Sequence, residues 1–175
     1  MTKSIPLFAV LALAVSCGKD APQPSGAASL PPSAYALAAE PAGAVSVLAA
    51  MAAAPKDDVV VVGRVREITP GLAAFTLTDD SLDYCGRTEM EGCEKPWDYC
   101  CHPSDEIAKN TVAVLVKDGK GDPVAAARLP ELRNLDLVVV KGRLVKDKAG
   151  NVELEATGWY RKERPTLPAE TVFPQ

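Results

Sequence analysis

Between residues 59 and 161 five segments have the apolar patterns of β-strands: 59–67, 74–79, 111–117, 137–145 and 151–161. Segments 74–79 and 151–161 alternate apolar and polar residues with a period of two, which indicates one buried face, whereas 59–67 and 137–145 begin as continuous apolar runs, which indicates a strand end buried on both faces. A further strand at 124–129 is expected if the turn at 118–123 closes a hairpin. The pattern therefore predicts a domain built from five to six short strands.

Two of these segments contain a glycine in the middle, Gly63 in the first and Gly142 in the fourth. A glycine inside a strand indicates a bulge or a sharp bend, as at the corner of a barrel. Closure of a small barrel also removes the exposed edges of a sheet. Three sequences resemble strands of the OB-fold: Val-x-Gly-x-Val in the first segment, Phe-Thr-Leu-Thr-Asp-Asp in the second and Val-Val-Val-Lys-Gly-x-Leu in the fourth. The resemblance implies an all-β fold, a small OB-like barrel at 58–164.

The N-terminus has the features of an export signal. Residues 5–16 form an apolar run behind Lys3, shorter than the roughly 20 residues that a membrane-spanning helix needs. The run ends at Ala-Val-Ser-Cys-Gly, and this end resembles the signal of a bacterial lipoprotein. The resemblance implies that residues 1–16 are a signal peptide and that Cys17 is lipidated. The mature chain is then exported and anchored to the cell membrane or the outer membrane, on the periplasmic side or at the cell surface.

Low-complexity segments flank the predicted barrel. Residues 17–57 contain six prolines among alanine, serine and glycine, and few large apolar side chains are available there to offset the entropy of ordering. We expect an Ala/Pro-rich, disordered linker in this segment, with a marginal short helix at 44–54. Residues 165–175 are expected to form a tail.

An acidic insertion separates the second and third predicted strands. Residues 80–110 form a longer connection than compact domains usually contain. The insertion holds four cysteines and the only histidine of the chain: Cys85, Cys93, Cys100, Cys101 and His102. Between residues 79 and 109 there are nine acidic and three basic residues, whereas the whole chain has a net charge of -4. The insertion therefore concentrates both the sulfur and the negative charge of the domain.

Two disulfides are the favoured interpretation of the four cysteines, because their number is even and the chain is expected to be exported. A bond between the neighbours Cys100 and Cys101 would be strained. Two pairings remain, in which Cys85 bonds to one member of the adjacent pair and Cys93 to the other. In the chain-entropy model each bond stabilises the fold by about 2–3 kcal/mol.

Two alternative interpretations use the same cysteines. Four thiolates, or three with the imidazole of His102, suit Zn(II), and thiolates also suit Cu(I). The wide spacing argues against zinc, and Cys100 and Cys101 would point in divergent directions in an extended chain. A thiol–disulfide redox protein is the third interpretation, although the chain has no Cys-x-x-Cys motif.

The remaining chemistry favours a binding or interaction module of the cell envelope over an enzyme, with no cofactor outside the metal alternative. A single histidine leaves few catalytic schemes, and the acidic charge disfavours nucleic acid. The partner, apart from the membrane, is expected to be an envelope protein or a small ligand, and Tyr84, Trp97 and Tyr99 are the candidate contact residues. The segment Lys-Pro-Trp-Asp-Tyr-Cys-Cys, residues 95–101, resembles a segment of uncharacterised secreted proteins of planctomycete type. That resemblance implies no particular activity.

Overall fold

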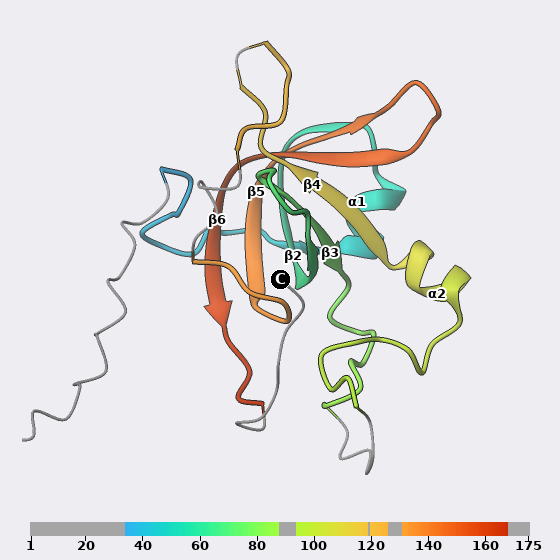
Figure 1. Ribbon diagram of the computed structural model, residues 1–175. Helices are drawn as coiled ribbons and strands as arrows, with labels where there is room; N and C mark the ends of the chain where they lie inside the picture. The colour runs from blue at the N-terminus through green and yellow to red at the C-terminus, as the bar shows by residue number, and fades with distance from the viewer. Residues whose placement is uncertain (1–33, 88–93, 119, 126–130, 168–175) are drawn as a thin grey trace, which may run out of the picture.

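The computed structural model describes residues 34–87, 94–118, 120–125 and 131–167. Its strands are β1 (Val45–Ser46), β2 (Lys56–Ile68), β3 (Ala74–Thr78), β4 (Thr111–Leu115), β5 (Leu137–Lys146) and β6 (Val152–Glu163). Five of them close into a barrel in the order β2-β3-β4-β6-β5, because β5 also pairs with β2 (Figure 1). The short β1 pairs with β2 on its own. Within the barrel β4 and β6 run parallel, and the other neighbours are antiparallel. The prediction of an all-β, OB-like barrel is confirmed.

β2 is a long strand that belongs to two parts of the barrel. Up to Arg64 it pairs with β5, and from Arg64 to Ile68 it pairs with β3. Gly63 lies where the partner changes, and a Cβ atom there would come within 2.7 Å of the Thr78 carbonyl oxygen. Only glycine fits this close approach, so the mid-strand glycine of the sequence has a steric reason.

The core of the barrel is formed by the inward-facing residues of every strand. Along β2, Val59, Val61 and Val65 alternate into the interior, as the two-residue period predicts. Trp159 on β6 is the largest of these side chains and is 1% exposed. Its ring meets Phe75 edge to face, with the centroids 6.4 Å apart. Trp159 is therefore part of the core.

The second half of the expected linker packs against the barrel. Tyr35 stacks on Trp159 with ring centroids 5.8 Å apart, and the two residues also share a backbone hydrogen bond. Helix α1 (Val47–Ala52) follows β1 and buries Val47 and Ala50 in the core. The linker was predicted because this segment contains few large apolar side chains. The residues that pack here are mostly small, so their burial was not evident from the sequence. The ordered domain thus extends to residue 34 in the described part of the chain.

Other features of the sequence lie outside the described residues or differ from expectation. The predicted signal peptide, Cys17 and most of the predicted tail lie outside the described residues. Of the expected strand at 124–129, Ala125 forms an isolated bridge with Leu72.

Helix α2 (Ser104–Lys109) was not predicted from the sequence. An ion pair between Asp105 and Lys109, one turn apart at 3.0 Å, supports it. No helix in the described ranges has the length and hydropathy of a membrane span.

Candidate functional site

The insertion leaves the barrel after β3 and returns at β4, so its two ends lie side by side (Figure 1). The hydroxyl oxygens of Thr78 and Thr111 are 3.0 Å apart. One residue further out, the Asp79 N–H donates to the Asn110 carbonyl at 2.8 Å. The register of β3 and β4 therefore fixes where the insertion begins and ends.

The Asp79 carboxylate ties the start of the insertion to helix α1. It accepts hydrogen bonds from the Leu48 N–H at 3.0 Å and from the Ser81 hydroxyl at 2.7 Å. Burial alone would raise the pKa of Asp79, but these hydrogen bonds together hold it below the ordinary value. Because the folded state favours the carboxylate, this contribution to stability is present at neutral pH and is lost as the pH falls through the lowered pKa.

A small hydrophobic cluster occupies the place where we expected a contact surface. Tyr84 and Tyr99 form it with Leu82 and Leu135, and Trp97 packs against it. Tyr84 is 7% exposed and Tyr99 is fully buried, so neither presents a surface to a partner, and the expectation fails for these two residues. Trp97 alone of the three aromatic residues is partly exposed. Burial raises the pKa of Tyr99 and keeps its phenol neutral.

A charged network joins this cluster to the barrel. Arg64 on β2 is 3% exposed, and its Nε donates to the Asp80 carboxylate at 2.6 Å while its Nη1 donates to the Leu135 carbonyl at 3.1 Å. Arg87 donates to the same Asp80 oxygen at 2.7 Å. The two guanidinium carbons lie 5.4 and 5.5 Å from the centroid of the Tyr84 ring. A buried guanidinium requires such partners, so the network holds the described part of the insertion against the barrel.

Three of the four clustered cysteines come together at the surface of the insertion. The Cys85 sulfur lies 3.2 Å from the Cys100 sulfur and 3.6 Å from the Cys101 sulfur. All three sulfurs lie within 4.8 Å of one another. Cys85 is buried, whereas Cys100 and Cys101 are exposed. Both distances exceed the about 2.05 Å of a disulfide, so no bond joins Cys85 to either neighbour in the described part of the chain.

The convergence depends on a turn that was not expected from the sequence. The His102 N–H donates to the Tyr99 carbonyl at 3.0 Å, so the chain reverses at Cys100 and Cys101 instead of running extended. The expectation that these two side chains diverge is therefore wrong: both sulfurs lie near Cys85. On the other side, the Cys85 N–H donates to the Asp98 carbonyl at 2.8 Å. This bond brings the two arms of the insertion together at the sulfurs.

A neighbouring glycine permits the two arms to approach closely. The Gly86 N–H donates to the Pro96 carbonyl at 2.7 Å. A Cβ atom on Gly86 would lie 2.8 Å from that same oxygen, so a larger residue would push the arms apart. The sulfur cluster therefore rests on a backbone frame that is independent of any bond between the sulfurs.

His102 does not belong to the sulfur cluster. Its Nε2 lies 2.9 Å from the Asp83 carbonyl oxygen, and its Nδ1 lies 3.3 Å from the Glu106 carboxylate. Both ring nitrogens thus serve the packing of the insertion, and the predicted ligand set of three thiolates with this imidazole is not assembled. Cys93 lies outside the described residues.

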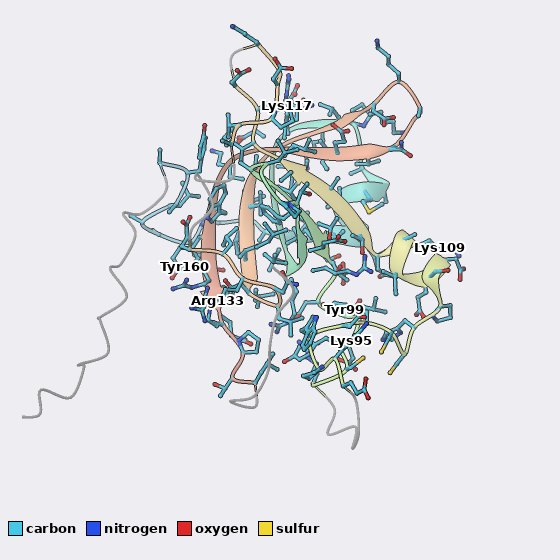
Figure 2. The ribbon with its side chains drawn as sticks, viewed as in Figure 1. Lys95, Tyr99, Lys109, Lys117, Arg133 and Tyr160 are labelled. Carbon is cyan, nitrogen blue, oxygen red and sulfur yellow. The ribbon has the colours of Figure 1, made fainter. Side chains whose placement is uncertain are left out.

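A groove of about 620 Å³ lies at the opposite end of the barrel, where Figure 2 places Lys117, while Lys95 and Tyr99 mark the insertion. The charged side chains of the groove pair with one another: Lys117 contacts Glu155 at 2.8 Å, and Lys141 contacts Asp58 at 3.3 Å. Hydrogen bonding to Glu155 raises the pKa of Lys117, which keeps it charged. Because the charges of the groove are paired with one another, the three clustered sulfurs are a better candidate for a functional site than the groove.

Comparisons with known proteins add no function. No family model matches the chain, and no curated protein matches it. A solved structure described as the hypothetical protein ygiW from E. coli matches with a TM-score of 0.39 and 15% sequence identity. The match covers 69% of this chain and 92% of that chain. The geometry of the insertion is therefore the main indication of function.

Proposed function

We propose that the chain is an exported, lipid-anchored binding module of the cell envelope, which contacts its partner through the insertion at 80–110. The barrel is the support, and the insertion is the recognition element. Anchoring through Cys17 follows from the resemblance of the N-terminus to a lipoprotein signal. The observation that carries the proposal is the fixed attachment of a strongly acidic insertion to the barrel.

The attachment supports binding because it lowers the entropy lost on association. An insertion of this length would ordinarily sample many conformations, and ordering it in a complex would weaken the affinity. Here the buried Arg64 and the cluster around Tyr99 fix it in advance. A partner then meets a surface that already has its bound shape.

The exposed acidic residues of the insertion indicate the chemistry of the partner. The side chains of Asp83, Asp105 and Glu106 are 53%, 71% and 46% exposed, and Glu94 is also exposed. Such a surface attracts a protein or peptide that carries basic residues, and it repels acidic polymers. Trp97, partly exposed in the same insertion, supplies an apolar contact.

Two disulfides that close the insertion complete the proposal. To reach the disulfide length of about 2.05 Å, the Cys85 sulfur must approach the Cys100 sulfur by about 1.2 Å or the Cys101 sulfur by about 1.6 Å. The cysteine left over is then available to Cys93. Both pairings expected from the sequence contain one such bond, and their second bond involves Cys93, which lies outside the described residues.

Mass spectrometry of the exported protein tests the anchor and the disulfides together. We expect an N-terminal Cys17 carrying acyl chains, and no alkylation of the four clustered cysteines without reductant. After reduction all four should react. A mature chain that begins elsewhere contradicts the anchor, and cysteines that react before reduction contradict the disulfides.

Charge reversal tests the binding surface. The double variant Glu94→Lys/Asp105→Lys should lower the amount of envelope protein retained by the purified chain at least ~10-fold, since each lost 1.4 kcal/mol is a factor of ten. Quantitative affinity capture from an envelope extract at low salt measures this. Both residues are exposed, but Asp105→Lys also removes the Asp105–Lys109 ion pair of helix α2, so circular dichroism must show that the fold is preserved.

The matched control makes the same change of charge away from the insertion. Asp57→Lys/Asp122→Lys replaces two exposed acids elsewhere on the domain and should leave retention unchanged. Equal losses in both double variants would show that net charge, and not the insertion, determines binding. Unchanged retention in the first variant would refute the proposed surface.

A further inference from the structure

The three converging sulfurs are placed almost as a metal ion would require. Thiolates at about 2.3 Å from one central ion lie about 4 Å apart when three of them surround it in a plane. The Cys85 sulfur is 3.2 and 3.6 Å from the other two, and the whole group lies within 4.8 Å. Adjustments of less than about 1 Å would therefore place all three around one ion.

Access to the cluster is open on one side. Cys85 is 3% exposed and lies at the base, whereas Cys100 and Cys101 are exposed. An ion from solvent would first meet the two exposed sulfurs and then the buried one. The frame of backbone hydrogen bonds around Cys85 and Tyr99 keeps the three positions together before any ion arrives.

The number and softness of the ligands select the metal. Thiolates favour soft ions, and structural zinc sites are almost always closed by four ligands. Among the described residues the cluster offers three, because His102 turns its ring nitrogens to Asp83 and Glu106. We propose that the reduced insertion binds one Cu(I) ion through the sulfurs of Cys85, Cys100 and Cys101.

This site goes beyond the proposed binding of a partner and does not depend on it. A thiolate that enters a disulfide is no longer a ligand, so metal binding and disulfide closure exclude each other at the same atoms. Binding of Cu(I) also releases protons, because the ligands must be thiolates. The site therefore exists only while the cysteines are reduced.

The test is a titration of the reduced full chain with Cu(I) under anaerobic conditions, in competition with a chromophoric Cu(I) chelator. We expect one tightly bound ion per chain in the reduced protein and none after air oxidation has removed the clustered thiols. Cys85→Ser and Cys101→Ser should each weaken the affinity at least ~100-fold, as a lost ligand costs more than a lost outer-shell partner. Circular dichroism shows whether each variant keeps its β-structure.

Three control variants make the outcome decisive. His102→Ala, Cys93→Ser and Cys17→Ser should leave the affinity within about threefold of the unmodified chain. Failure to bind one equivalent, or equal binding by folded Cys85→Ser, would overturn the proposal. A loss in Cys93→Ser as large as that in Cys85→Ser, or preferential binding of Zn(II), would overturn the assignment to a three-sulfur Cu(I) site. None of these results changes the expected capture of a basic partner by the acidic insertion. The Cu(I) site and the partner-binding surface can therefore be refuted independently of each other.

Discussion

Arg64→Met is expected to lower the free energy of unfolding by about 3 kcal/mol, because it removes the charged centre that joins the insertion to the barrel. The side chain is 3% exposed and makes hydrogen bonds to Asp80 and to the Leu135 carbonyl. Methionine fills a similar volume but leaves that carbonyl without this donor. Urea unfolding at neutral pH measures the difference.

Arg87→Met is the matched control for this prediction. Arg87 contacts the same Asp80 carboxylate and the same Tyr84 ring, but its side chain is 29% exposed. Water therefore replaces part of what is lost, and we expect a cost of about 1 kcal/mol or less. Equal costs for the two variants would mean that burial of Arg64 is not what holds the insertion in place.

Trp159→Ala should cost about 4 kcal/mol, as for other large aromatic side chains removed from a core. Trp159 is 1% exposed, contacts Phe75 and Tyr35, and donates from its indole N–H to the Glu131 carboxylate at 2.8 Å. The cavity would open between the barrel and the N-terminal segment. Thermal or urea unfolding followed by circular dichroism gives the value.

The neighbouring Tyr160 supplies the control. It lies on the opposite face of β6 and is partly exposed, so Tyr160→Ala should cost about 1 kcal/mol. A cost for Tyr160→Ala that matched the cost for Trp159→Ala would contradict the assignment of Trp159 to the core.

The strands were predictable because each carries its own signal. The β-branched run from Val59 to Val62 predicted the first strand, and the structure extends this strand by only a few residues. Gly63 indicated a special backbone position, and the close approach of Thr78 explains it. These features depend on local sequence and on the two-residue period alone.

The packing of the N-terminal segment was not predictable in the same way. Val47 and Ala50 are small residues in an alanine-rich stretch, and they are buried only because the barrel provides a surface for them. The stacking of Tyr35 on Trp159 joins residues that are far apart in the chain. No local pattern carries that information.

The candidate site was predicted in its residue types but not in its arrangement. The spacing of the cysteines identified the cluster, yet the turn that brings Cys100 and Cys101 to Cys85 has no glycine, proline, asparagine or aspartate at its two central positions. Tyr84 and Tyr99 suggested a surface because they stand in a loop. They are buried because Leu135, from the segment before β5, completes their cluster.

The way the barrel closes has a consequence for how the chain reaches its native state. Only two neighbouring pairs of barrel strands, β2 with β3 and β5 with β6, follow each other through short connections. The ring is completed by β3 against β4 across the insertion, by β2 against β5, where Val61 meets Val140, and by the parallel pair β4 and β6. Contacts this remote along the sequence cost loop-closure entropy before they stabilise anything, and β-proteins dominated by them fold in milliseconds to seconds. We therefore expect the pairing of β2 with β5 to be the rate-limiting step of folding. The β2–β3 and β5–β6 hairpins should become stable only once that pairing has formed.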